Sequence, residues 1–226
     1  TFTSMFQGCV SLEQVNTDGF ILASATNMVN MFRDCLKLQK IDFSKPPARY
    51  TTAPNLANMN TFAYNCSSLQ EFKFLPNFRG DSLLYMIQAF HNCTTLEHFD
   101  MSDWQLPAIR GLAWMFVNCQ RLYDIKTPEI LTPNATLRNI TAMFADCRSL
   151  EKLDLNFLNV SAINTTAESS SAGWEYPTLS GNDVMGMGYM MGGCTSLTEV
   201  DMSSWVLNAT GKINFKRTVL GIILHL

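Results

Sequence analysis

A regular spacing of hydrophobic residues around seven cysteines is the strongest pattern in the chain. A leucine follows every cysteine by three residues, and further, mostly apolar residues follow six and eight residues after the cysteine. Apolar residues at every second position predict a short strand with one buried face. The cysteines that anchor these seven units are Cys9, Cys35, Cys66, Cys93, Cys119, Cys147 and Cys194.

The segment before each cysteine has a different period. Apolar residues seven, four and three positions before the cysteine, such as Met28, Met31 and Phe32 before Cys35, would share one face of a helix. The residue just before the cysteine is Gly, Asp or Asn in all seven units, and these residues tolerate the left-handed conformation that ends a helix. Each unit is therefore predicted to contain a helix of two to three turns, a left-handed turn, a buried cysteine and a strand.

The intervals between the cysteines are 26, 31, 27, 26, 28 and 47 residues. A period of this size is typical of a solenoid, in which each unit buries its apolar face against its neighbours. No Cys-x-x-Cys pair occurs, so we interpret the cysteines as reduced core residues, all seven buried, rather than as a metal or disulfide array.

The last interval is about 20 residues too long, which predicts an insertion loop at about 162–182. This polar segment contains Trp174 and Tyr176, which either anchor a partner or fold back onto the solenoid. At the end of the chain, Ile223 aligns with the cysteine position of a degenerate eighth unit. We expect residues 1–226 to form a single solenoid that is part of a longer chain.

Residues 31–44 and 143–155 carry a resemblance to a known family. Both match the core MF-x-x-C-x-x-L-x-x-φ-D-φ of the BspA-like leucine-rich repeats, and residues 31–44 also have the serine that follows it. Three units depart from the Met-Phe pair, at Phe62-Ala63, at Ala89 and at Met190-Met191, but keep its apolar character. The resemblance implies an α/β, right-handed leucine-rich-repeat solenoid of short parallel strands and short helices. It also implies a microbial surface protein similar to adhesins, with a protein or glycan of a host or neighbouring cell as partner.

Two columns of polar residues, five and seven positions after each cysteine, mix positive and negative charges. In a parallel sheet they would lie opposite each other on neighbouring strands and form ion pairs. We interpret this array either as a charge lattice that fixes the register or as a polar binding face. The candidate partner-binding residues are those beside the insertion, together with its aromatic pair: Lys152, Asp154, Glu199, Asp201, Trp174 and Tyr176.

Composition removes several other functions. The 16 Lys and Arg residues against 19 Asp and Glu, a net charge of −3, leave no basic surplus for nucleic acid. The longest apolar run, from Val219 to Leu224, is too short to insert into a membrane. The three histidines lie at unrelated repeat positions without a catalytic or metal motif. We therefore expect no enzyme activity, no metal and no cofactor.

Asn-x-Ser/Thr sequences point to a secreted protein and give candidate glycosylation sites at Asn134, Asn139, Asn164 and Asn208. The sequence thus predicts a non-catalytic recognition or adhesion module, extracellular or at the cell surface. The alternative is a structural spacer or a protomer of a larger assembly, such as a stalk, sheath or viral fibre, in which the chain associates with copies of itself.

Overall fold

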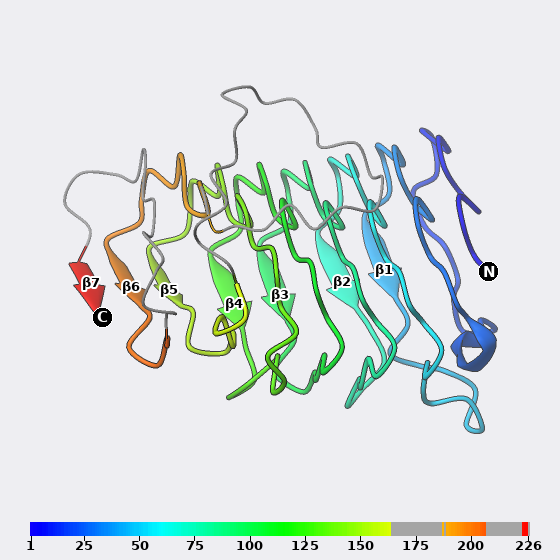
Figure 1. The fold of residues 1–226 in the computed structure, drawn as a ribbon. Helices are drawn as coiled ribbons and strands as arrows, with labels where there is room; N and C mark the ends of the chain where they lie inside the picture. The colour runs from blue at the N-terminus through cyan, green and yellow to red at the C-terminus, as the bar shows by residue number, and fades with distance from the viewer. Residues whose placement is uncertain (164–186, 188, 207–222, 226) are drawn as a thin grey trace.

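The computed structural model describes residues 1–163, 187, 189–206 and 223–225. Within this part, the chain forms one short 3-10 helix, η1 (Leu22–Ser24), and seven three-residue strands. The strands lie side by side in chain order from the N-terminus to the C-terminus (Figure 1). They are β1 (Lys40–Asp42), β2 (Glu71–Lys73), β3 (His98–Asp100), β4 (Asp124–Lys126), β5 (Lys152–Asp154), β6 (Glu199–Asp201) and β7 (Ile223–His225).

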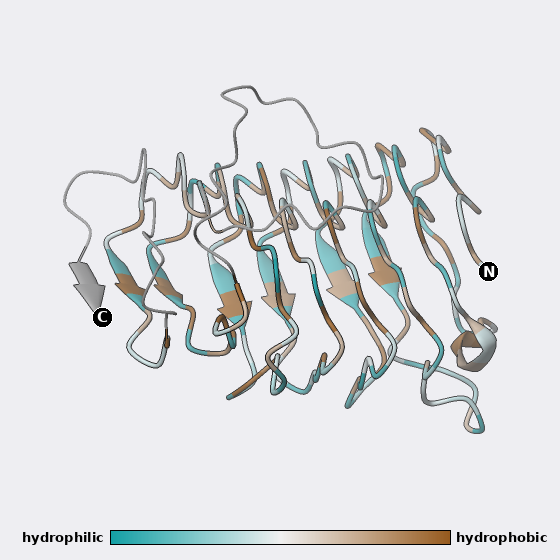
Figure 2. Cartoon of the chain, viewed as in Figure 1, coloured by the Kyte–Doolittle hydropathy of each residue, from teal (hydrophilic) through white to brown (hydrophobic). Residues whose placement is uncertain are grey.

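The strands pair in parallel, with equivalent residues of successive units opposite each other. Ile41 lies opposite Phe72, and Phe99 lies opposite Ile125. Pairing joins β1 to β2, β3 to β4, β5 to β6, and β6 to β7. Hydrophilic and hydrophobic residues lie next to each other along β1 to β6 (Figure 2). The predicted strands and their stacking in a repeat solenoid are thus confirmed.

The predicted position of the eighth unit was wrong. Leu224 pairs with Val200, so Ile223 occupies the first position of a strand rather than the position of the cysteine. The two assignments differ by five residues. The last segment of the chain has no cysteine to mark its register, so its hydrophobic residues alone fit several repeat positions. The pairing of β7 with β6 selects one of these positions.

The segment before each cysteine is not a helix, so that prediction was also wrong. In the second unit, the N–H groups of Met31, Arg33 and Cys35 donate to Met28 O (3.2 Å), Asn30 O (3.2 Å) and Phe32 O (3.1 Å), the bonds of three overlapping β-turns. Asn30, the third residue of the first turn, has a φ of 57°. We call this segment, from seven residues before each cysteine to the cysteine itself, the turn ribbon. A helix and a series of overlapping turns both place apolar residues three and four positions apart on one side, so the hydrophobic spacing did not separate them.

Two positions of the turn ribbon have positive φ in every unit. The position before the cysteine was predicted from its Gly, Asp and Asn residues, and its left-handed conformation is confirmed. The position five residues before the cysteine has no such composition, so its positive φ was not predicted. Its residues are Ser4, Asn30, Thr61, Gln88, Trp114, Ala142 and Tyr189.

Alternate N–H groups of the turn ribbon bond to the next unit. Phe32 N–H donates to Phe62 O, and Asp34 N–H donates to Tyr64 O, both at 2.8 Å. The intervening N–H groups close the turns, as at Cys35. The ribbon therefore satisfies its backbone donors without a helix, and it links each unit to the following one.

The cysteines add a second link between units. Each thiol after the first donates to a carbonyl of the preceding unit at 3.0–3.3 Å, as Cys119 Sγ does to Phe90 O at 3.1 Å. These six thiols are buried, and burial raises the pKa of Cys194 to about 12. Reduced, buried cysteines are thus confirmed for six units. Cys9 is free but exposed, because it lies on the outer side of the first unit of the described solenoid.

Candidate functional site

The exposed side of the strands carries a two-column array of polar side chains. The second residue of each strand points into the core, so the first and third residues point outward. We call these outward residues of β1 to β6 the strand face. It comprises Lys40, Asp42, Glu71, Lys73, His98, Asp100, Asp124, Lys126, Lys152, Asp154, Glu199 and Asp201.

Ion pairs connect neighbouring strands across this face. Lys40 Nζ lies 2.9 Å from Glu71 Oε2, and Lys152 Nζ lies 2.7 Å from Glu199 Oε2. Within a strand, Lys73 Nζ lies 2.6 Å from Glu71 Oε1. The predicted pairing of charges between strands is confirmed. Each exposed pair contributes little stability, about 0–1 kcal/mol, but it holds its side chains in place.

The aspartates in the third position of the strands also shape the chain that follows. Asp42 Oδ1 accepts hydrogen bonds from Ser44 N–H (2.9 Å) and Ser44 Oγ (2.6 Å), and Ser102 bonds Asp100 in the same way. Burial would raise the pKa of Asp42, but the bonds from Ser44 and the Lys40 ammonium outweigh it and lower the pKa to about 2. The Asp-φ-Ser part of the repeat therefore turns the chain out of the strand.

A hydrogen-bonded cluster lies in the middle of the strand face. His98 Nδ1 is 3.1 Å from Asp124 Oδ2, and His98 Nε2 is 2.9 Å from the Tyr123 hydroxyl. The two rings meet edge to face, with centroids 4.7 Å apart. The Tyr123 side chain is held in this way while 53% of its surface remains exposed. A rigid aromatic ring among polar groups is a common anchor for a binding partner.

The sequence analysis missed Tyr123. It stands four residues after Cys119, and the same position in the other six units holds Glu, Gln or Thr. A single aromatic residue in an otherwise polar column was the available signal.

The structure brings four of the predicted partner-binding residues together. Lys152 and Glu199 form an ion pair, and Asp154 lies opposite Asp201 in the register of β5 and β6. The predicted insertion from residue 164 onward, with Trp174 and Tyr176, lies outside the described residues, as do Asn164 and Asn208.

The other two candidate glycosylation sites differ from each other. Asn134 is exposed and donates through Nδ2 to Pro107 O at 3.1 Å. Asn139 is 7% exposed, and its Oδ1 accepts the Thr141 N–H at 2.9 Å. The burial of Asn139 counts against a glycan there, because an attached sugar needs solvent space.

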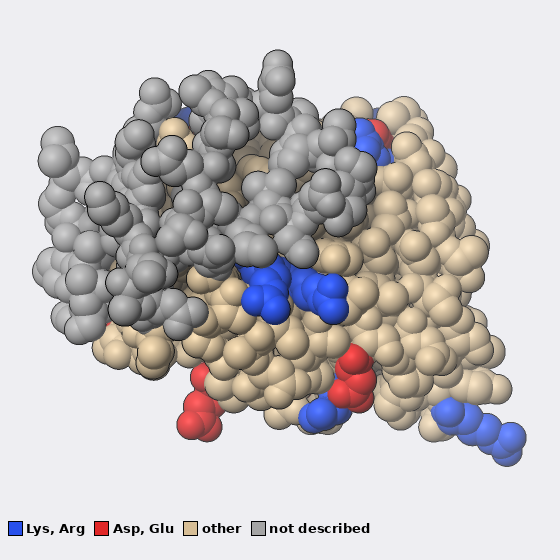
Figure 3. Space-filling model, in the orientation of Figure 1, with Lys and Arg blue, Asp and Glu red and all other residues tan. Residues whose placement is uncertain are grey.

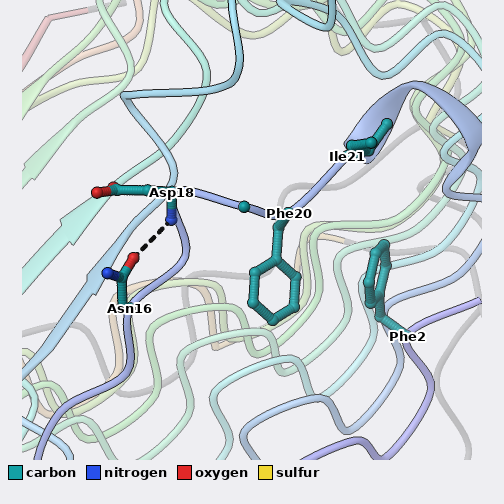
Figure 4. A pocket seen from close by; sticks show the side chains of 6 residues that line it. Phe2, Asn16, Asp18, Phe20 and Ile21 are labelled. Atoms are coloured by element: carbon teal, nitrogen blue, oxygen red, sulfur yellow. Dashed lines mark hydrogen bonds between the residues drawn. The ribbon is translucent and has the colours of Figure 1, made fainter.

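Outside the strand face, the other kinds of site to consider among the described residues are a pocket, a metal site and a membrane span. An open depression at the N-terminal end has apolar walls from Phe2, Phe20 and Ile21, beside a hydrogen bond from Asp18 N–H to Asn16 Oδ1 (Figure 4). No group of three His, Cys, Asp or Glu residues in the described part could hold a metal ion. None of the helices described there is long and apolar enough to cross a membrane. Charged side chains are scattered on the visible described surface of Figure 3.

The stacked parallel strands and their leucine column define a leucine-rich-repeat protein. The chain belongs to the family described as "Mycoplasma protein of unknown function, DUF285", whose family model matches residues 1–71 and 42–155. Among curated proteins, none matches the chain.

One solved structure is similar, a leucine-rich repeat protein from Bacteroides ovatus. It has 15% sequence identity and a TM-score of 0.43. The alignment covers 92% of this chain and 58% of the Bacteroides chain, so this chain spans less than two thirds of that protein's length.

Proposed function

We propose that the chain is a non-catalytic recognition module of the BspA-like type, which works at the cell surface or outside the cell. Its partner is a protein or glycan of a host or neighbouring cell. The strand face is the observation that supports this most. It exposes hydrogen-bond donors and acceptors at fixed positions, as in the ion pair of Lys152 with Glu199. Because its charges largely neutralise each other, such a face selects a partner by geometry more than by long-range attraction.

We place the contact region on β5 and β6 and the segment beside them. It includes Lys152, Asp154, Glu199 and Asp201, together with Trp174 and Tyr176 of the predicted 162–182 insertion. Aromatic anchors within a polar rim are the usual composition of an interaction hot spot.

The test is binding of the fluorescently labelled protein to cultured epithelial cells and to a printed glycan array. We expect the double variant Lys152→Ala, Asp154→Ala to lose at least about tenfold in binding. A matched control is Arg79→Ala, Asp81→Ala, which removes an exposed ion pair of 2.7 Å outside the strand face. Equal binding by both double variants would refute the assignment of the contact region.

Deleting residues 164–182 supplies a second arm of the test. We expect reduced binding with an unchanged circular dichroism spectrum, because a change in loop length costs little closure entropy. If the intact protein binds neither cells nor glycans, light scattering after size-exclusion chromatography tests the structural alternative. A self-assembling chain would then support the role of spacer or protomer.

A further inference from the structure

The sheet is interrupted between β4 and β5. Parallel strands that pair directly lie about 4.8 Å apart. No Cα atom of β4 lies within 8 Å of a Cα atom of β5. The turn ribbon remains closed at the same junction, where Phe116 N–H donates to Met143 O at 2.9 Å. The units are also joined before the strands, where Ser149 Oγ donates to Gln120 O at 2.8 Å, and after them, where Leu131 N–H donates to Phe157 O at 2.9 Å. They therefore separate only along the strands themselves.

Backbone groups on both sides of this break lack the partners found where strands pair, as do the N–H groups of Phe74 and Glu97 at the interruption between β2 and β3 among the described residues. The N–H group eight residues after the cysteine bonds to the next unit at 2.8–2.9 Å in Phe43, Met101 and Leu155. The equivalent N–H of Thr127 has no hydrogen bond within the described part of the chain. The N–H four residues after the cysteine bonds to the preceding unit in Gln39, Gln70, Tyr123 and Thr198. The equivalent N–H of Glu151 finds no described partner either. Unpaired groups along a strand edge are a template for another strand.

The side chains distinguish this break from the one between β2 and β3. Ile125 is the only central residue of β1 to β6 that is not fully buried, and it packs at the margin of the core. Tyr123 stands at the start of β4, where one side of its exposed ring packs against His98 of β3. The sheet is also interrupted between β2 and β3, but there Phe72 and Phe99 stack with centroids 5.4 Å apart and are both buried. The β4–β5 break alone combines open backbone groups, a half-buried aliphatic residue and an aromatic anchor.

We propose that the β4–β5 break binds an extended polypeptide segment, which adds to the open edge of β4 as an extra strand with Tyr123 as its anchor. This inference rests on the proposed recognition function and names its partner as a protein. A strand inserted between two others needs those two strands to lie about 10 Å apart. The Cα atoms of β4 and β5 are more than 8 Å apart, which is compatible with that spacing. Main-chain bonds to Thr127 N–H and Glu151 N–H supply the affinity, as in other cases of strand addition.

The surrounding charges define the composition of that segment. Asp124 of β4 and Lys152 of β5 occupy the same repeat position on either side of the break, as do Lys126 and Asp154. An outward side chain of the added strand therefore lies between opposite charges, which favours neutral polar residues. The side chain that points inward meets Ile125, which favours an aliphatic residue. The preferred segment is uncharged, with alternating threonine or serine and valine.

The probe is the capped peptide acetyl-Gly-Ser-Thr-Val-Thr-Ser-Gly-amide, titrated into isotope-labelled protein and followed by amide NMR shifts. We expect saturable shifts centred on the amides of Thr127 and Glu151. Tyr123→Ala should weaken binding by about fivefold or more, while Tyr50→Ala, which removes another exposed tyrosine, should leave binding unchanged. The same peptide with N-methyl groups at Val and the second Thr should not bind.

Three outcomes would overturn the inference: no shifts at millimolar peptide, shifts centred elsewhere, or equal binding of the N-methylated peptide. Tyr123→Phe, which keeps the ring, covers the case in which Tyr123→Ala alters the fold. If the peptide fails while the protein still binds cells or glycans through β5 and β6, the proposed function stands and only this partner assignment falls.

Discussion

The turn ribbon and the strand face form two edges of the same units, but only the ribbon is continuous. Along the ribbon, each of the first six units donates backbone hydrogen bonds to the next, and six cysteine thiols donate to the preceding unit. Along the strand face, pairing stops between β2 and β3 and again between β4 and β5. The difference indicates that the ribbon holds the stack together, while the strand side can open and vary its exposed side chains.

The aromatic core follows the ribbon. Phe90, Phe116 and Phe144 stack in succession, with centroids 5.8 and 5.6 Å apart, across the junction where β4 and β5 separate. A break in the sheet therefore leaves the core intact. Substitutions on the ribbon should accordingly destabilise the fold more than substitutions on the strand face.

The largest effect is expected at a left-handed position of the ribbon. Asn118 has a φ of 60°, and its Nδ2 donates to Asn92 Oδ1 at 2.8 Å. In Asn118→Val, a β-branched residue must adopt that conformation and the hydrogen bond is lost, so we expect a loss of about 2–3 kcal/mol in unfolding free energy. Urea unfolding followed by circular dichroism measures it.

Asn118→Gly is the matched control, because glycine adopts a positive φ without strain. We expect it to change the unfolding free energy by less than about 1 kcal/mol. Equal losses in the two variants would show that the side-chain bond matters and the backbone conformation does not.

The next effect concerns the cysteine ladder, the six buried cysteines whose thiols each donate to a carbonyl of the preceding unit. Cys119→Ala removes a buried sulfur and its bond to Phe90 O, and we expect a loss of about 1–2 kcal/mol. Cys9→Ala, at the exposed position, should be close to neutral. In the native protein, a thiol reagent should label Cys9 rapidly and the other six slowly, since burial removes access and raises the pKa of Cys35 to about 11. Rapid labelling of more than one thiol would contradict the ladder.

The sequence predicted the strand side better than the ribbon. Ile41 and Phe43 fix a period of two that only a strand satisfies, and the parallel register followed from the repeat. On the ribbon, Met28, Met31 and Phe32 fit a helix and a series of overlapping turns equally well. The deciding feature, positive φ at positions such as Trp114, accompanies a bond to the next unit, from Trp114 N–H to Thr141 O, and has no signature in residue type.

The part of the candidate site that follows from position in the repeat was predictable from the sequence, and the rest was not. Charge pairing such as Lys152 with Glu199 follows from position in the repeat. The opening between β4 and β5 does not, because it depends on how two units of normal sequence diverge in space. Tyr123 gains its significance only beside that opening.

On the strand face, a charge reversal should cost less. Lys73→Glu replaces the partner of Glu71 with an acid, beside Asp42 on β1. We expect a loss of about 0.5–1 kcal/mol at low salt that shrinks at about 0.5 M salt, because exposed charges are screened. Lys45→Glu, a reversal in the exposed loop after β1, is the control and should have little effect. A loss that does not depend on salt would contradict an electrostatic role.

The smallest effect is a pH dependence at Asp42. The folded chain lowers the pKa of this carboxyl to about 2, below its ordinary value of 3.8, so the ionised form stabilises the fold. That contribution is complete above about pH 4 and disappears as the pH falls through the folded pKa, because the unfolded chain binds the proton first. We expect Asp42→Asn to be less stable than the natural protein by about 1 kcal/mol or less near pH 5, with the difference vanishing toward pH 2. Acid titration of urea unfolding in both proteins measures this, with Asp18→Asn as a control in the first unit. A difference that persists unchanged to pH 2 would mean that Asp42 acts through the turn at Ser44 and not through its charge.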